Sequence, residues 1–577
     1  MRRMALQQLV IVTAALVVAA GCTSTPTVEP ANMVVHDGKI VTMDPAKPEV
    51  QGLAIRGDRI VAVGTTADMQ PYIGPATEVI DLSGLTAVPG LIEGHGHFMG
   101  LGQSRMVLDL MSTTSWDQIV ALVAEAAAKA TPGEWIRGRG WHQEKWTSVP
   151  QPNVEGFPIH DALSTVSPNN PVILEHASGH ATYVNAKAMD AAGITRLTKN
   201  PPGGEILKDK AGRPNGVLRE TASDLAEDAL AAWFAKKTPE ARAADTRRQI
   251  ELAVEASLQK GITSFQDAGE NFGTIDVLKQ AAADGTLRIR LWVMVRDTND
   301  NIRAKLPTYK AVGLNDNHLT IAAIKKTIDG ALCSRGAWML APYSDSPGSS
   351  GLNTAPVPEV QALAAIAAAN GVQLGVHAIG DRANREVLDI YEATFKANPT
   401  VKDWRWRIEH AQHLSAADSP RFGQLGVIAS MQGIHATSDA PYVLARLGAV
   451  RAEEGAYVWQ KLMKSGAVVA NGTDVPVERI DPMPNLYATI TRKTKDGTPF
   501  YPDQRMSREE ALRSYTYNAA YAAKEEHLKG SLAVGKLADI TVLTKDIMTV
   551  PENEIPTADV AYTIIGGKVM YRVTAAK

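Results

Sequence analysis

Cysteine is nearly absent from this chain of 577 residues. Cys22 and Cys333 are the two that occur, so a disulfide framework is excluded. A basic excess is also missing, because 59 Lys and Arg oppose 62 Asp and Glu, which leaves a formal net charge of −3. This balance gives no electrostatic case for a nucleic-acid partner. What remains is an ordinary globular composition, 45% hydrophobic and 21% charged, with ample core.

The apolar stretch at the N-terminus is too short for a comfortable membrane span. It covers residues 9–20, follows Arg2 and Arg3, and precedes Ala19-Ala20-Gly21-Cys22. This pattern resembles a bacterial lipoprotein signal over residues 1–22, in which Cys22 is lipidated and becomes the mature N-terminus. An ordinary secretory signal, cleaved nearby, is the alternative.

The lipoprotein interpretation predicts an exported protein. Residues 23–32 would be a polar tether. Thr23, rather than Asp, follows Cys22, which resembles sorting to the outer membrane, so we expect a lipid anchor there that faces the periplasm. If Cys22 is acylated, the mature chain keeps Cys333 alone, and no internal disulfide can form.

The two ends of the chain are rich in short strands. Residues 34–41 predict two strands around an Asp-Gly turn, and residues 53–63 predict two more around Gly57-Asp58. The C-terminal end repeats the pattern at 538–543 and 562–570. Because neither end has enough strands for a sheet of its own, we expect one small β-sandwich built from residues 33–88 and 529–577.

The middle of the chain, residues 89–528, alternates strand-like and helical runs. The predicted strands are 91–92, 261–265, 289–295, 319–324, 372–376, 406–409, 427–431 and 467–470. Polar residues follow most of these strands, which predicts an α/β fold, a (β/α)8 TIM barrel. The first two strands are too far apart for a loop, so residues 100–245 predict an inserted subdomain over the barrel mouth. A capping box at Ser507 predicts a helix over 509–524.

His95 and His97 follow the first barrel strand directly. Residues two apart on a strand point to the same side, so both imidazoles can face one metal ion. Two loop histidines without a metal are the alternative for this motif alone. Further candidate ligands follow the fourth, fifth, sixth and eighth predicted strands. They are Lys325, His377, His410 and Asp474.

With these positions, the chain resembles the amidohydrolase superfamily, and in detail its branch with N-substituted formamide deformylase. The resemblance covers nearly the whole mature chain. The matching motifs are 89–98, 138–141, Gly179-His180 with Asn185, 329–332, 342–348, 377–381, 407–412, 435–439 and 472–476. His142, which follows Trp141, departs from the acid usual in relatives and puts the transfer of substrate contacts in doubt.

The resemblance implies a metal centre with one or two ions, usually Zn²⁺, although another divalent metal is an alternative. His95, His97 and Asp474 would bind one ion, and His377 and His410 the second. Lys325, carboxylated by CO₂, would bridge them. Lys326 is adjacent, but strand neighbours face opposite sides, and the family spacing to Asp329 selects Lys325. If Lys325 is unmodified, the site could hold a single ion.

Asp474 has two expected roles, as a metal ligand and as the general base that takes a proton from a metal-activated water. Metal binding lowers the pKa of such a water to about 7. A helix N-cap is the alternative role for Asp474. We expect His180 to stabilise the carbonyl oxygen or contact substrate, and Trp141, Tyr343 and His435 to contact substrate. Cys333 has apolar neighbours, which favours a packed thiol.

These residues predict an enzyme that hydrolyses C–N bonds outside peptides, in an amide or N-acyl small molecule. Hydrolytic deamination of a cyclic amine or amidine is the alternative reaction. A tethered binding lipoprotein without catalysis is the alternative from another class. The sequence leaves the substrate's identity and the oligomeric state open, with a homo-oligomer among the alternatives.

Overall fold

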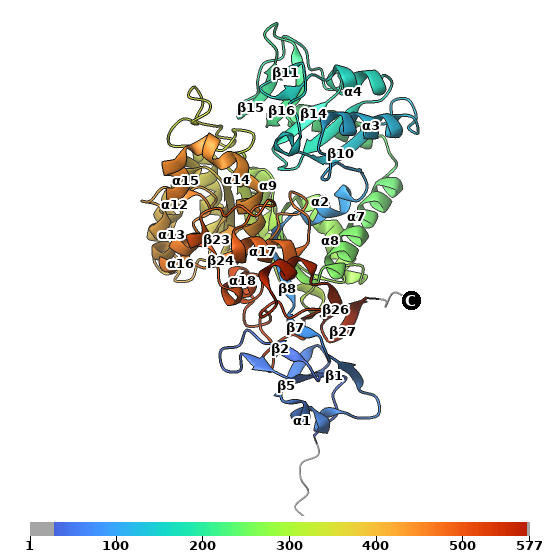
Figure 1. Cartoon of the computed structure of the whole chain (residues 1–577), viewed down its shortest axis with the longest axis vertical. Coiled ribbons are helices and arrows are strands. Elements are labelled where there is room, and N and C mark those ends of the chain that lie inside the picture. The colour runs from blue at the N-terminus through green and yellow to red at the C-terminus, as the bar shows by residue number, and fades with distance from the viewer. Residues whose placement is uncertain (1–27, 574–577) are drawn as a thin grey trace, which may run out of the picture.

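The computed structural model describes residues 28–573, and its centre is a barrel of eight parallel strands (Figure 1). In barrel order the strands are β8 (Leu91–Gly96), β17 (Ile262–Glu270), β18 (Arg290–Val295), β20 (Leu319–Thr327), β21 (Gln373–Ala378), β22 (Arg407–His410), β23 (Ile428–Met431) and β24 (Val469–Asn471). A short strand, β19 (Ala311–Gly313), pairs with β20 from outside this order. The predicted (β/α)8 class and all eight predicted strands are confirmed. Their near-continuous apolar runs are typical of parallel strands buried on both faces.

The first and last barrel strands meet just beyond the end of β24. The amide of Asp474 donates to the carbonyl of His95 at 2.8 Å, and the amide of His97 donates to the carbonyl of Val475 at 2.7 Å. Gly94 permits this approach, since a Cβ there would lie 2.4 Å from the carbonyl oxygen of Asn471. This contact places the His95-Gly-His97 motif beside Asp474.

Helices surround the barrel (Figure 1). They are α2 (Phe98–Ser104), α7 (Pro239–Gln259), α8 (Phe272–Ala283), α9 (Asn299–Tyr309), α10 (Leu314–Asn317), α11 (Val357–Asn370), α12 (Asp381–Ala397), α13 (Ser419–Leu425), α14 (Gly433–Leu447), α15 (Ala449–Gly455), α16 (Trp459–Lys464), α17 (Pro482–Thr491), α18 (Arg508–Ser514) and α19 (Tyr517–Ala522). The capping box of Ser507 and Glu510 is present. The single helix predicted over 509–524 is wrong, because Thr516 leaves helical geometry with φ −129° and ψ −92° and separates α18 from α19.

Strands from both ends of the described chain form two sheets below the barrel in Figure 1. One sheet has the order β5-β4-β1-β6 and the other β27-β26-β25-β7-β2-β3. Their strands are β1 (Met33–His36), β2 (Lys39–Val41), β3 (Glu49–Val50), β4 (Gly52–Arg56), β5 (Arg59–Gly64), β6 (Glu78–Asp81), β7 (Thr86–Pro89), β25 (Ile540–Leu543), β26 (Val560–Ile565) and β27 (Lys568–Arg572). Both sheets contribute apolar residues to one core, among them Val35, Leu53 and Val542.

The turn at Asp37-Gly38 corrects one expectation. β1 and β2 do not pair around it as a hairpin, because β1 lies in the first sheet and β2 in the second. Asp37 has φ 60°, and a Cβ on Gly38 would lie 2.3 Å from the Cβ of Leu82. The chain therefore changes sheets at this tight point, which local turn preferences alone do not reveal.

A third sheet lies above the barrel in Figure 1, between α2 and α7 in the chain. Its order is β15-β16-β14-β13-β10-β9. Its elements and those beside it are β9 (Leu108–Asp109), β10 (Ile136–Trp141), β11 (Asn153–Val154), β12 (Phe157–Pro158), β13 (Val172–His176), β14 (Ala181–Val184), β15 (Gly204–Lys208), β16 (Pro214–Glu220), α3 (Trp116–Ala127), α4 (Asp161–Val166), α5 (Ala186–Ala191) and α6 (Asp224–Phe234). We call this region the inserted subdomain.

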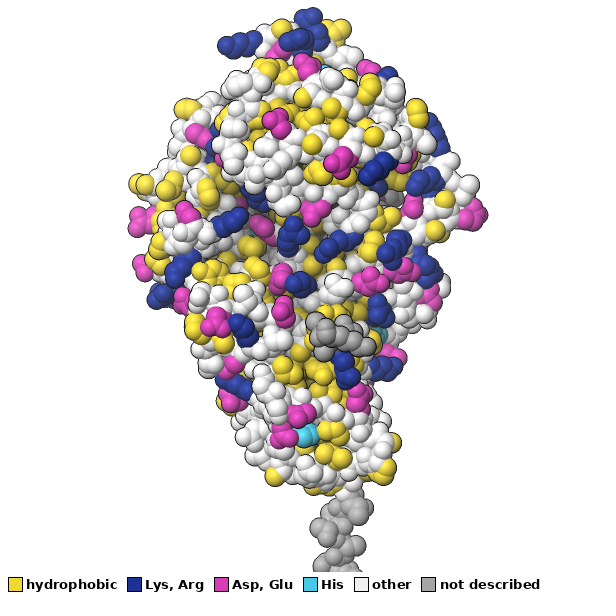
Figure 2. Space-filling model, turned by 45° about the vertical axis from the view of Figure 1, so that its right-hand side comes forward, with side chains coloured by type: hydrophobic (Ala, Val, Ile, Leu, Met, Phe, Trp, Pro, Cys, Tyr) yellow, Lys and Arg dark blue, Asp and Glu magenta, His cyan; other side chains and the backbone are white. Residues whose placement is uncertain are grey.

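The predicted signal segment 1–22, with Cys22, and residues 23–27 of the predicted tether lie outside the described residues. Among residues 28–573, no helix combines the length and the apolarity that crossing a membrane requires. On the face shown in Figure 2, basic and acidic side chains are interspersed.

Candidate metal centre

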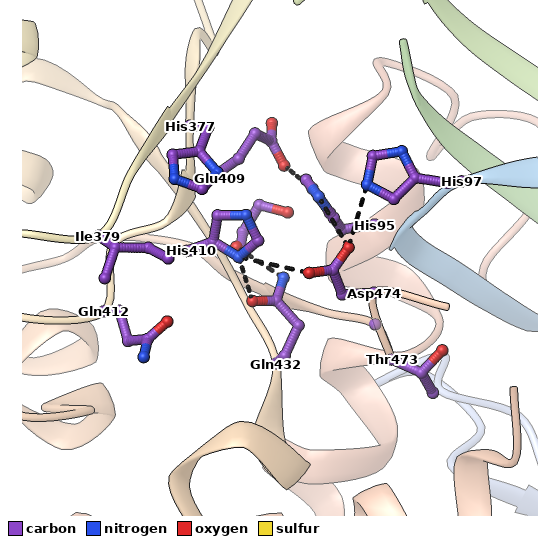
Figure 3. A network of polar contacts seen from close by, with 12 residues as sticks. His95, His97, His377, Ile379, Glu409, His410, Gln412, Gln432, Thr473 and Asp474 are labelled. Carbon is purple, nitrogen blue, oxygen red and sulfur yellow. Dashed lines mark hydrogen bonds and ion pairs between the residues drawn. The ribbon is translucent and has the colours of Figure 1, made fainter. Parts of the chain in front are cut away.

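Three histidines and a carboxylate converge where β8, β22 and β24 end (Figure 3). Asp474 Oδ1 lies 3.5 Å from His95 Nε2 and 3.3 Å from His97 Nε2. Asp474 Oδ2 lies 3.9 Å from His410 Nδ1. The strand-end positions therefore bring four of the predicted ligands together around one carboxylate.

His377 and Lys325 complete the group, which we call the barrel-mouth cluster. The ring centroid of His377 is 4.5 Å from that of His410, which is 4.8 Å from that of His95. Lys325 is buried, and burial lowers its pKa to about 8. Lys326 points away and pairs with Glu359 at 3.3 Å. The alternation along β20 thus places Lys325 toward the cluster.

Two of these imidazoles are held in orientation by a hydrogen bond from the ring to a neighbouring side chain. Glu409 Oε2 accepts a hydrogen bond from His95 Nδ1 at 2.5 Å, and Arg407 pairs with the same carboxylate at 2.7 Å. Gln432 Oε1 lies 2.7 Å from His410 Nδ1. With Nδ1 engaged, each of these imidazoles has its Nε2 available for an ion.

The electrostatics of the cluster favour the metal-ligating forms. Burial lowers the pKa of His95 to about 4 and holds the pKa of His377 and His410 well below the usual value. Burial alone would raise the pKa of Asp474, but the neighbouring histidines, His95 first, hold it well below its usual range. Neutral imidazoles therefore surround an ionised carboxylate at neutral pH.

Three buried atoms of the cluster have no hydrogen-bond partner among the described residues. They are His95 Nε2, His377 Nε2 and Asp474 Oδ1. Unpaired buried polar atoms are costly, and imidazole nitrogen with carboxylate oxygen is a donor set that suits Zn²⁺ and similar ions. The residues present therefore fit a metal ion.

The backbone at two ligands has left-handed geometry, with φ 76° at His410 and φ 56° at Asp474. Such geometry is uncommon outside glycine and clusters at functional sites. Glu409, the residue before His410, is fully buried beside His95. The left-handed geometry at His410 lets its side chain face the same cluster as that of Glu409. The expected alternative for Asp474, a helix N-cap, is not what is found, since the next helix, α17, is capped by Asp481.

A cavity of about 1200 Å³ opens over the cluster, between the barrel mouth and the inserted subdomain. His97, Lys325, His377, His410 and Asp474 line it from the barrel, and His180 lines it from the subdomain. The ring centroids of His180 and His377 are 4.9 Å apart. The predicted catalytic histidine therefore lies directly beside the predicted ligands.

Glu220 holds His180 in this position. Its Oε2 lies 2.7 Å from His180 Nδ1, and Ser334 Oγ donates to its Oε1 at 3.2 Å. Gly330 and Gly336 leave room for this carboxylate, since a Cβ on either would lie 2.1 Å from its Oε1. Burial alone would lower the pKa of His180, but Glu220 raises it above its usual value.

Comparison with known proteins agrees with this site. The amidohydrolase family matches residues 78–571. This chain belongs to the amidohydrolase family. It is 33% identical over 552 residues to Protein LONG AFTER FAR-RED 3 of Arabidopsis thaliana. The match covers 94% of this chain and 92% of that protein.

Two further relatives of this amidohydrolase are informative. N-substituted formamide deformylase of Arthrobacter pascens is 27% identical over 569 residues, covering 94% of this chain and 99% of that protein. The crystal structure of an uncharacterised metal-dependent hydrolase from Pyrococcus horikoshii superposes with a TM-score of 0.71 at 26% identity, covering 90% of this chain and 99% of that one.

Three predicted substrate contacts of the amidohydrolase lie outside the residues that line the cavity. Trp141 is fully buried in the inserted subdomain, where its Nε1 donates to the carbonyl of Leu174 at 2.8 Å. The hydroxyl of Tyr343 donates to the carbonyl of Ala337 at 2.7 Å. His435 is buried on α14, with its ring centroid 6.3 Å from that of His410. All three are buried in this structure.

Glu409, Gln432 and Glu220 are the residues that the sequence did not single out. Glu409 had one local signal, because it precedes His410 in a predicted barrel strand. Gln432 and Glu220 had none, because they meet their histidines across 22 and 40 residues of chain.

Proposed function

We propose that this amidohydrolase is a metal-dependent hydrolase of C–N bonds outside peptide chains, with amides or N-acyl small molecules as substrates. The observation that carries the proposal is a set of buried ligand atoms without a hydrogen-bond partner in the described part of the chain. His377 and Asp474 line a cavity of about 1200 Å³, and His95 Nε2 lies 3.5 Å from Asp474 Oδ1. The relative named N-substituted formamide deformylase supports this class of bond.

The proposed ligand assignment is the one that the family resemblance implies, and all of its residues belong to the barrel-mouth cluster. His95, His97 and Asp474 would hold one ion, and His377 and His410 a second, with Lys325 as a CO₂-derived carbamate between them. A buried lysine whose pKa is about 8 has a substantial neutral fraction near neutral pH, which carboxylation requires. When bound, zinc supplies an activated water and polarises a carbonyl oxygen.

Asp474 handles the proton in this proposal. Its carboxylate takes a proton from the attacking water as the water oxygen adds to the acyl carbon. The same proton then passes to the nitrogen as the C–N bond breaks, which gives a carboxylic acid and an amine. An ionised carboxylate at the cavity floor is suited to this general-base role, which contributes about 10²- to 10⁴-fold in rate.

His180 binds the carbonyl oxygen in the proposal. Its Nδ1 donates to Glu220, and because Glu220 raises the pKa of His180, the protonated ring carries a second proton on Nε2 that can be donated toward the cavity. Such a donor stabilises negative charge as it develops on the oxygen. Because His180 and Glu220 both belong to the inserted subdomain, this part of the site depends on how the subdomain sits on the barrel.

Activity on a panel of N-acyl and N-formyl amines tests the proposal. The purified protein, loaded with zinc, is expected to release a free amine and a carboxylate in equal amounts. Release of ammonia from a cyclic amine would instead support the deaminase alternative. Absence of stoichiometric divalent metal after expression with zinc would support a binding lipoprotein.

Carboxylation of Lys325 has its own test. Metal content is expected to rise by about one ion per chain when bicarbonate accompanies zinc. A Lys325→Ala variant should show no response to bicarbonate, whereas Lys326→Ala should respond as the parent does. A bicarbonate response that persists in Lys325→Ala would contradict the carbamate.

We also propose export and lipid anchoring through Cys22 to the outer membrane, on the sequence pattern of residues 1–22. In a bacterial host the full chain is expected in the outer-membrane fraction, and Cys22→Ser is expected to abolish lipidation. An unlipidated parent chain would contradict the proposal.

A further inference from the structure

A second group of metal-ligating side chains lies outside the cavity. His142 follows β10, His176 ends β13, and Cys333 lies in the loop after β20. One ligand atom from each lies within 4.8 Å of the other two. We call this group the His–Cys cluster. None of its three residues lines the cavity over the barrel mouth.

Two members of the His–Cys cluster are buried, and His142 is half-buried. His176 is 1% exposed and Cys333 is 4% exposed. Burial lowers the pKa of His142 to about 3 and holds that of His176 well below its usual value, so both imidazoles are neutral. Burial raises the pKa of the Cys333 thiol to about 12. A cation could therefore enter by replacing a single proton, that of the thiol.

The existing hydrogen bonds do not close the cluster to an ion. His176 Nε2 lies 3.0 Å from Gln143 Oε1, and its Nδ1 lies 2.8 Å from Ser178 Oγ. The amide of Ser178 donates to this Nδ1 at 3.0 Å, so the ring proton lies on Nε2, and an ion at Nε2 requires that proton to move to Nδ1 and be donated to the Ser178 hydroxyl. His142 Nδ1 accepts only a long bond from the amide of Glu144, at 3.2 Å. Losing such bonds costs little beside the free energy of thiolate coordination to zinc.

The cluster lies where the inserted subdomain meets the barrel. His142 and His176 belong to the subdomain, and Cys333 belongs to a barrel loop. Arg446 of α14 bridges the same junction, since its Nη2 donates to the carbonyl of Cys333 at 3.2 Å and to Glu144 at 3.0 Å. An ion at this place would therefore join two separate parts of the fold.

We propose that His142, His176 and Cys333 form a second metal site that takes one thiophilic divalent cation, such as Zn²⁺, and ties the inserted subdomain to the barrel. Two imidazoles and a thiolate are a common zinc donor set, and Gln143 offers an oxygen for the fourth position. Binding expels the Cys333 proton to solvent and changes no oxidation state. The site holds the subdomain that carries His180.

Cobalt substitution tests this site directly, because a thiolate bound to Co²⁺ gives a charge-transfer band in the near ultraviolet and imidazole or carboxylate ligands do not. The barrel-mouth cluster contains no cysteine, so its ions do not contribute to the band. Titration of the metal-free full chain with Co²⁺ is expected to produce the band, with a final amplitude that corresponds to one thiolate-bound ion per chain.

Variants assign the band to its ligands. Cys22→Ser and the barrel variant His97→Gln should keep the band, and Cys333→Ser should lose it. His142→Gln and His176→Gln should each weaken cobalt binding by at least about 10-fold, whereas His160→Gln in the same subdomain should not. A band that is absent from the parent chain, or that survives in Cys333→Ser, overturns the proposal. If Cys333→Ser does not fold, loss of the band in Cys22→Ser overturns it instead.

Discussion

The barrel-mouth cluster and the His–Cys cluster both gather neutral imidazoles at the ends of parallel strands, but different ligands accompany them. The barrel cluster combines histidine with Asp474 and Lys325 and opens into the cavity. The His–Cys cluster combines histidine with a buried thiol and lies outside the cavity. A metal ion with an open coordination position can act on a substrate, whereas an ion whose ligands, thiolate among them, fill its coordination is usually structural. The ligands that accompany histidine and the access to the cavity thus distinguish the two clusters.

The largest expected difference between the clusters is in catalysis. Asp474→Asn keeps the size of the side chain but removes the carboxylate that accepts the proton, so we expect kcat to fall by about 10²- to 10⁴-fold. The cobalt–thiolate band should be unchanged in this variant. Initial rates at saturating zinc provide the measurement, with the exposed Asp300→Asn as control. Full activity in Asp474→Asn would sink the general-base role.

Glu409→Gln should distinguish the clusters by metal affinity. The carboxylate receives the Nδ1–H of His95, and losing such a partner typically weakens metal binding by about 10- to 100-fold. Competition with a chelator measures the affinity of the barrel ions, and Glu359→Gln, whose carboxylate pairs with Lys326, is the matched control. Equal affinities for the parent and Glu409→Gln would contradict this positioning role.

Glu220→Gln should lower activity while leaving metal content unchanged. The charge-assisted bond to His180 is lost, and a single bond of this kind corresponds to about 10-fold in rate. We expect the loss mainly in kcat rather than in KM, because the oxygen-binding role strengthens in the transition state. Glu205→Gln in the same subdomain is the control. A change confined to KM would show that Glu220 acts on substrate binding alone.

The remaining prediction concerns acid stability of the metal-free protein. The folded pKa is about 4 for His95 and about 3 for His142, below the ordinary value of 6.5. Between the folded pKa and 6.5, the unfolded chain binds more protons than the folded chain. Each histidine therefore lowers the free energy of unfolding as pH falls below 6.5, by up to about 1.4 kcal/mol per pH unit. Above pH 6.5 neither contributes.

Differences between variants isolate this contribution, because burial raises the pKa of Glu93 to about 8, which acts in the opposite direction. In urea titrations at pH 7 and pH 5, His95→Gln and His142→Gln should each lose less stability on acidification than the parent. The exposed His527→Gln is the control. Equal acid sensitivity in all four proteins would contradict neutral burial in both clusters.

The barrel and its proposed ligands could be predicted because their signals are local. A buried run of β-branched and aliphatic residues marks each strand, and His95, Lys325, His377 and Asp474 follow such runs within a few residues. The position of a residue after a strand already fixes the edge of the barrel where it lies. The alternation along β20 likewise separates Lys325 from Lys326 without knowledge of any distant residue.

The rest depends on contacts that no local pattern contains. Trp141 ends β10 and Tyr343 stands in the loop after β20, and the polar atoms of both donate to buried backbone carbonyls. Cys333 has apolar neighbours in the chain and histidine neighbours in space. Glu220 reaches His180 because β16 pairs with β14. Turn lengths and packing against distant residues determine the register of that pairing.

The sheet shared by both ends of the chain has a consequence for the order of folding. β7 pairs with β25, and Leu91 bonds to Thr541 across 450 residues. During synthesis β2, β3 and β7 must wait, with β7 unpaired on one edge, until the whole barrel has emerged. Closure across so long a span is slow. Assembly of this sheet therefore comes late, and a chain that stops before β25 keeps an exposed edge that chaperones and proteases can recognise.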